Sequence, residues 1–203
     1  MNRLGANPSG GNLYRQEQAQ WSTALAQGAV AGSLASLLSS AVLMLMGRRE
    51  AGSAAAPANA TSQWLWGREA LHRQEADVRH TLAGYLIHHG AAKFWATAYA
   101  ALTRKRPQWR TPTGVVAGGA ATSAVACFVD FRMTPSRLTP GFEHRLSRPA
   151  LAGVYGAFAV GLALGAWALR NRYPETGRRS QRGTWDEDGS GVESLGDGAP
   201  TEV

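Results

Sequence analysis

Apolar residues in this chain of 203 residues gather in four blocks that are separated by polar segments. The blocks run over residues 24–46, 81–102, 111–129 and 149–169. Each is close to the roughly 20 residues that a helix needs to cross about 30 Å of hydrocarbon. The pattern therefore predicts an all-α fold, an integral membrane bundle of four transmembrane helices within residues 21–172.

The first block, residues 24–46, carries no charged residue and is followed by Arg48 and Arg49. A cleaved signal peptide is the alternative, because the small residues that follow, AGSAAAPANA, could supply a cleavage site. The apolar core is longer than that of a signal peptide, and the two arginines intervene. We therefore expect a retained helix.

Two of the blocks begin with signals for the start of a helix. Thr111 stands before Pro112, and Ser147 stands shortly before Pro149. Hydroxyl side chains accept hydrogen bonds from the free N–H groups of a first helical turn, where proline is also favoured. These residues predict helix starts near Thr111 and Ser147.

Glycines recur at four-residue spacing in three of the blocks. The pairs are Gly28 and Gly32, Gly114 and Gly118, and Gly161 and Gly165. Small residues at this spacing let helix backbones approach closely in a membrane, where the hydrophobic effect does not drive helices together. We expect helix packing at these glycines, within the chain or between chains; the alternative is that glycine is merely abundant.

The polar ends of the chain differ from the blocks in composition. Residues 1–20 predict a flexible tail, residues 173–203 a disordered tail, and residues 51–63 a flexible linker. The net charge is +7, and arginines beside apolar blocks favour membrane flanks over a nucleic-acid surface. The short basic loop TRKRPQWR, residues 103–110, places both termini in the cytoplasm by the positive-inside rule.

The stretch YLIHHGAAKFW brings His88, His89 and Lys93 into the second block. A charged lysine near the middle of a bilayer costs at least about 2.5 kcal/mol, so Lys93 is expected to face protein or water. Three interpretations of the histidines stay open: polar packing between helices, a ligand or proton site, and a metal or haem site.

A second group of polar residues follows the third block, in residues 130–149. Prolines and a glycine there predict a shaped loop, and four spans place it on the same membrane side as the start of the second block. Acidic side chains of this loop can then meet the histidines. The candidate polar site comprises His88, His89, Lys93, Asp130, Arg137 and Glu143.

The loop also carries a resemblance. Its residues Asp130-Phe131, Pro135 and Arg137-Leu138-Thr139-Pro140-Gly141-Phe142-Glu143 follow a histidine-containing span. With this motif at this position, the stretch from Leu82 to Leu169 resembles small uncharacterised multi-span proteins of the bacterial inner membrane. The resemblance implies that location and a helical architecture, and it implies no catalytic residue.

Three functions are compatible with these features. A structural or accessory membrane component agrees best with the packing glycines and with the lack of a P-loop, HExxH or GxSxG motif. The first alternative is a small oligomeric transporter or proton-coupled carrier that uses the His/Lys/Asp cluster. The second is a membrane enzyme or a haem-binding subunit with His88 or His89 as the ligand. We expect no other cofactor, no metal and no nucleic acid, and as partners the lipid bilayer and a homo-oligomer or another membrane protein.

Overall fold

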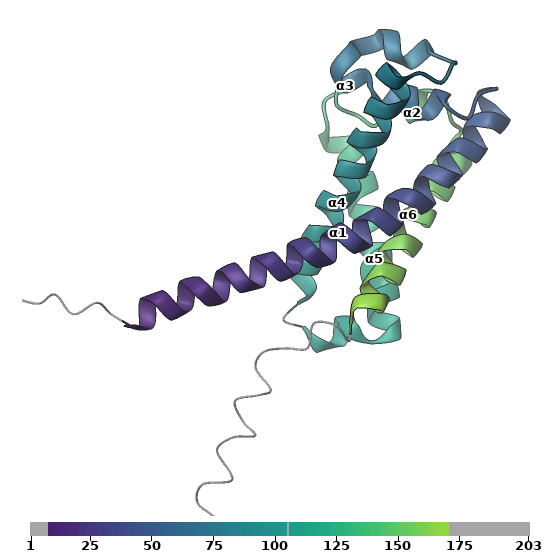
Figure 1. Cartoon of the computed structure of the whole chain (residues 1–203). Helices are drawn as coiled ribbons and strands as arrows, with labels where there is room; N and C mark the ends of the chain where they lie inside the picture. Colours follow the sequence, from purple (N-terminus) through teal and green to yellow (C-terminus); the bar gives the residue numbers. More distant parts are fainter. Residues whose placement is uncertain (1–7, 105, 171–203) are drawn as a thin grey trace, which may run out of the picture. The chain divides into compact units, whose positions relative to one another are not determined.

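The computed structural model describes residues 8–104 and 106–170, and within these residues it is helical with no β-strand (Figure 1). The expected tail at 173–203 lies outside the described residues. Four long helices are α1 (Pro8–Glu50), α4 (Ala83–Thr103), α5 (Pro112–Phe128) and α6 (Arg148–Leu169). Two short helices are α2 (Ala56–Thr61) and α3 (Gln63–Trp66). The remaining turns of helix are Gly67–His72, Val78–Leu82, Pro107–Arg110, Val129–Met133 and Phe142–His144.

Helix α1 is the centre of the bundle, because α4 and α6 both pack along it, and α5 packs on α6. Helix α4 barely touches α5 or α6. At one end, Ser147 ties the start of α6 to the end of α1: its N–H and its hydroxyl donate to the two carboxylate oxygens of Glu50, at 2.7 and 2.8 Å. The helix starts predicted at Thr111 and Ser147 are confirmed, since each hydroxyl accepts from a backbone N–H three residues on.

Glycines make the close contacts of α1 with its two neighbours. A Cβ atom added at Gly32 would collide with the backbone of Lys93 in α4, and one at Gly161 would collide with the backbone of Ala35 in α1. Gly28 lies in the same way against Thr97 of α4, and Gly165 against Ala31 of α1. The packing therefore joins helices of one chain.

The other GxxxG pair, in α5, makes different contacts. Gly118 faces the ring of Tyr99 in α4. Gly114 faces the backbone of Gln108 and Trp109, in the turn just before its own helix. Only one member of this pair therefore lies against another long helix.

Alanines fill the contact of α1 with α4, and many large apolar side chains lie on the outside of the bundle. Ala35, Ala92 and Ala96 are buried in the central cluster. Large apolar side chains on the long helices point outward, namely Leu25, Leu37, Met44, Leu86, Phe94, Leu102, Val116, Val125, Phe128, Val160 and Leu164. Exposed apolar surface of this extent is typical of a protein that contacts lipid or a partner.

Among the described residues, three helical stretches are long and apolar enough to cross a membrane: Leu13–Glu50, Pro112–Met133 and Arg148–Leu169. The fourth expected span, residues 81–102, folds as a helix over most of its length. Its mean hydropathy is lower than that of the other three, and His88, His89 and Lys93 contribute most to the difference. The structure thus shows a helical bundle with three candidate spans.

Two segments that were expected to be flexible are helical. Residues 8–20 continue α1 as one helix, and the side chains of residues 13–19 are exposed. The expectation of a linker at 51–63 is wrong, because α2 lies in it and Ala56 and Ala60 are fully buried. The carbonyl of Ala58 lies directly over the Cα atom of Gly84 in α4. Small residues resemble a linker by composition, but here they allow close backbone packing.

Candidate functional site: a cavity beside helix α4

The loop after α5 forms one end of the site. Its residue Gly141 has a φ of +85°, a conformation that favours glycine, and it packs against the backbone of Ala60 in α2. The side chains of Gln63 and Trp64 donate to the carbonyl of Thr139, at 2.9 and 3.0 Å. These contacts hold Phe142 in the core at 3% exposure.

A cavity of about 580 Å³ lies between α4 on one side and α5 and α6 on the other. Ser39 of α1 lines its base, and the 134–142 loop closes one end. The cavity reaches the outer apolar surface, because Leu86 and Phe94 line it and are 56% and 65% exposed. Cavities of this size hold small ligands in many proteins.

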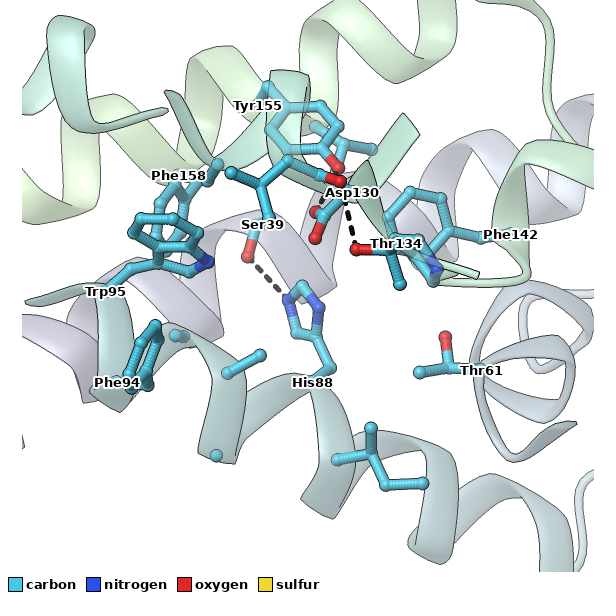
Figure 2. A pocket seen from close by; sticks show the side chains of 18 of the residues that line it. Ser39, Thr61, His88, Phe94, Trp95, Asp130, Thr134, Phe142, Tyr155 and Phe158 are labelled. Atoms are coloured by element: carbon cyan, nitrogen blue, oxygen red, sulfur yellow. Dashed lines mark hydrogen bonds between the residues drawn. The ribbon is translucent and has the colours of Figure 1, made fainter. Parts of the chain in front are cut away.

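His88 enters the cavity from α4 and binds to α1. Its Nε2 atom lies 2.8 Å from the hydroxyl of Ser39 (Figure 2). That hydroxyl has one proton, which it donates to the carbonyl of Ala35 at 2.7 Å. With its proton on Ala35, Ser39 accepts from Nε2–H of His88, so this arrangement of hydrogen bonds has the ring proton on Nε2. In the neutral ring, Nδ1 is then a hydrogen-bond acceptor.

Asp130 lies on the opposite wall, at the end of α5. The hydroxyl of Tyr155 in α6 donates to its Oδ2 atom at 2.6 Å, and Figure 2 shows both side chains across the cavity from His88. No basic side chain of the described residues forms an ion pair with Asp130. The carboxylate therefore has a hydroxyl as its neighbour and no cation.

The structure brings together two of the six residues proposed as a polar site, His88 and Asp130. Neither His89 nor Lys93 lines the cavity; the His89 ring stacks on Tyr85, with ring centroids 5.6 Å apart. Arg137 is exposed on the loop. Glu143 is partly buried, and its carboxylate lies 3.7 Å from the ring of His144. The two histidines thus have different surroundings, because adjacent residues on a helix point in different directions.

Ser39 and Tyr155 complete the polar end of the cavity, and sequence reasoning did not select them. Tyr155 is the one hydroxyl-bearing side chain within the apolar block 149–169, which was an available signal. The sequence gives no signal that singles out Ser39, because its block contains several serines and only the fold shows which of them faces His88.

A second cavity of about 840 Å³ lies on the other side of α4, between α1, α2 and residues 74–78. His88 and Thr61 line both cavities. His88 therefore lies between the second cavity, next to residues 74–78, and the first cavity, which opens to the apolar surface.

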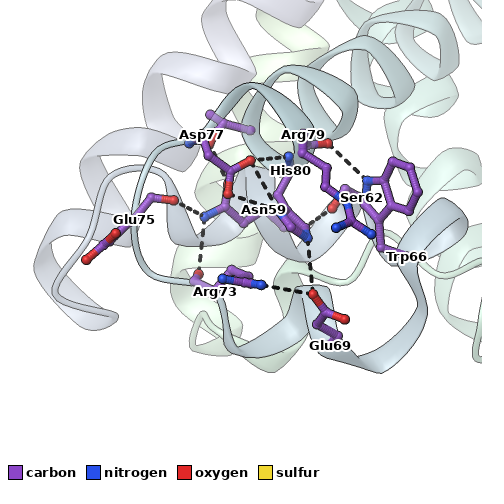
Figure 3. Close-up of polar contacts among 10 residues, drawn as sticks. Asn59, Ser62, Trp66, Glu69, Arg73, Glu75, Asp77, Arg79 and His80 are labelled. Carbon is purple, nitrogen blue, oxygen red and sulfur yellow. Dashed lines mark hydrogen bonds and ion pairs between the residues drawn. The ribbon is translucent and has the colours of Figure 1, made fainter.

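A polar network covers the start of α4 (Figure 3). The Asn59 side chain donates to the carbonyls of Arg73 and Glu75 and accepts from the hydroxyl of Thr81, at 3.2, 2.9 and 2.6 Å. This network fixes the loop before α4 onto α2.

His80 is the histidine of this network and is 2% exposed. Its Nδ1 lies 2.9 Å from the carboxylate of Asp77, and its Nε2 lies 3.8 Å from Glu69. The backbone N–H of His80 lowers the pKa of Asp77, and the Arg73 side chain lowers the pKa of Glu69. His80 is thus held by Asp77, three residues before it, and does not contact Asp130.

Within residues 8–104 and 106–170, no three or more His, Cys, Asp and Glu side chains converge in a way that could hold a metal ion. The haem alternative through His88 or His89 stays a prediction, and the visible absorption spectrum of purified protein tests it.

Comparisons of the chain with models of protein families, with curated proteins and with solved structures find no match.

Proposed function

We propose that this chain is a membrane protein of four spanning helices that binds an amphipathic, lipid-like molecule in the cavity beside α4. The observation that carries the proposal is the form of the cavity: apolar walls, a rim at Leu86 and Phe94 on the outer surface, and polar groups gathered at one end. An apolar chain can enter from lipid, while a polar head group meets His88 and Asp130.

Helix α4 is included as a span because its 21 residues are long enough to cross a bilayer and its His88 side chain points into the bundle. His88 bonds to Ser39 in the interior, whereas Leu86, Phe94 and Leu102 point outward. A hydrogen bond between helices compensates a polar side chain in a membrane. Four spans, the bacterial inner membrane and cytoplasmic termini together form our topology proposal, which accessibility labelling of single cysteines introduced at residues 10, 75 and 106 tests.

A matched pair of glycines allows a direct test of binding. A Cβ atom at Gly90 meets nothing, and Gly90 lines the cavity; a Cβ atom at Gly156 also meets nothing, but Gly156 does not line it. Gly90→Trp should fill the cavity without a backbone clash, and Gly156→Trp is the control.

Native mass spectrometry of the protein extracted in a neutral detergent is the measurement. We expect retained lipid-sized adducts in the wild type and in Gly156→Trp, and their loss in Gly90→Trp. Equal adducts in all three proteins would contradict the proposal and favour a structural or accessory role.

A carrier is the second candidate function, and the sharing of His88 and Thr61 by the two cavities favours it. Four helices leave little room for alternating access, so a carrier of this size would work as a homo-oligomer. Flux of a lipophilic solute into proteoliposomes should then fall in Gly90→Trp. A protein that is monomeric in the membrane and shows no such flux would contradict it.

A further inference from the structure

The donors at the polar end of the cavity are already used within the protein. The hydroxyls of Thr61 and Thr134 donate to the carbonyls of Pro57 and Val129, at 3.1 and 2.9 Å. The indole of Trp64 donates to Thr139, as described above. The hydroxyls of Ser39 and Tyr155 donate to Ala35 and Asp130. None of these groups has a proton left for a ligand.

Trp95 is the exception, since its indole N–H has no acceptor among the described residues. Its ring packs with the apolar cluster around Phe158, and Figure 2 shows it beside Phe94 and Phe158. It therefore belongs to the apolar part of the cavity, where a chain would lie.

The acceptors at the polar end are free. Nδ1 of His88 has no hydrogen-bond partner among the described residues, and neither has Oδ1 of Asp130. The lining of the cavity includes no lysine and no arginine from the part of the chain that the structure describes. A ligand that supplies hydrogen-bond donors and positive charge fits this end of the cavity, because a carboxylate accepts hydrogen bonds and attracts a cation when it is ionised.

From this charge and hydrogen-bond complementarity we propose that the head group of the bound amphiphile is a primary ammonium. This inference rests on the proposed function and specifies its ligand. A primary ammonium has three N–H donors in a compact group. One donor reaches Asp130, a second reaches His88, and the attached chain extends between α4 and α6 toward Trp95. Hydrogen bonds to charged groups are the stronger ones, so this head group gains more than a neutral hydroxyl.

The test is titration calorimetry in a neutral detergent with four probes that share one twelve-carbon chain: dodecylamine, dodecyltrimethylammonium, dodecanol and dodecanoate. We expect dodecylamine to bind about tenfold or more tightly than dodecanol, and dodecanoate to bind least. Dodecyltrimethylammonium has the charge without N–H donors, so it should fall between dodecylamine and dodecanol.

Variants link the preference to the two acceptors. Asp130→Asn should remove the advantage of dodecylamine over dodecanol while dodecanol still binds. His88→Leu should reduce it in part. Lys93→Leu, which changes a residue outside the cavity, should leave it unchanged. Thermal unfolding of each variant shows whether it is folded.

A primary ammonium could belong to a single-chain amine or to the head group of phosphatidylethanolamine. Nanodiscs of phosphatidylethanolamine and of phosphatidylcholine distinguish them: competition with dodecylamine by the former alone indicates the phospholipid. Equal binding of all four probes, blocked by Gly90→Trp, would overturn the inference and keep the proposed function. Binding of no probe, or binding that Gly90→Trp does not block, would overturn both.

Discussion

The interface of α1 with α6 and the space between α4 and α5 are built in opposite ways. In the first, Gly161 and Gly165 lie directly on the backbone of α1, and nothing larger fits. In the second, Gly90 faces open space and bulky side chains stand apart around a cavity. The bundle is thus held together through α1, and this leaves the α4–α5 side free to open without loss of the core.

The strongest test of this comparison exchanges glycine for leucine on both sides. Gly161→Leu should destabilise the protein by about 3 kcal/mol or more, because its side chain would meet the backbone of Ala35. Gly90→Leu should leave stability unchanged or slightly raised, since glycine inside a helix costs roughly 0.5–1 kcal/mol relative to alanine. Thermal unfolding in detergent measures both, and similar losses in the two variants would refute the contrast.

On the cavity side of the bundle, Tyr155 of α6 donates a hydrogen bond to Asp130, and Tyr155→Phe removes it. It leaves Asp130 without its hydroxyl donor, so we expect a loss of about 2 kcal/mol, as for other hydrogen bonds to charged groups. Equilibrium unfolding measures it. The variant Tyr155→Phe combined with Asp130→Asn should lose less than the sum of the two single variants, and simple additivity would show that the pair does not interact.

On the α1 side of the cavity, Ser39→Ala removes the acceptor of His88. The expected loss is about 1 kcal/mol, the usual size for a hydrogen bond between helices in a membrane. The tautomer of His88 should also change, and ¹⁵N NMR of the labelled histidine ring reports it. A ring spectrum identical to that of the wild type would contradict the assignment of the proton to Nε2.

The smallest effect is expected where α4 begins, at Asp77. Its pKa in the folded protein lies below the ordinary value of 3.8, because the backbone N–H of His80 donates to it. A lowered pKa stabilises the fold at pH values above the pKa of the unfolded chain. This contribution is lost as the pH falls through the pKa of the folded protein. The melting temperature of the wild type should therefore exceed that of Asp77→Asn at pH 6, and the difference should shrink below pH 4. A constant difference from pH 6 to pH 3 would contradict this role of the carboxylate.

The elements of the bundle could be predicted well where a single signal dominates. Apolar blocks locate α5 and α6, and Thr111 and Ser147 mark where they begin. Segment 51–63 was misjudged because alanine, serine and glycine are equally frequent in linkers and in tightly packed turns. The fit of Ala58 over Gly84, 26 positions apart, cannot be seen in local composition.

In the candidate site, too, local sequence signals predicted some features and contacts between distant residues decided the others. Polarity in the sequence selected His88 and Asp130, which line one cavity, and it also selected Lys93 and Arg137, which do not line it. The four have similar polarity in sequence. They differ only in the direction in which their helices and loops point them.

By itself, the sequence determined the helical character, the approximate bounds of α4, α5 and α6, and the small residues through which the helices can pack, because these follow from periodicity, composition and chain geometry. Only the tertiary structure decided that the glycine pair of α1 lies against α4 and the pair of α6 lies against α1, and that Ser39 is placed to accept from His88. It alone decided, too, that Asp130 lies across the cavity from His88 with no basic side chain of the described residues paired to it. Each of these depends on contacts between distant residues, and such contacts are set when side chains compete for the same space and the same hydrogen-bond partners.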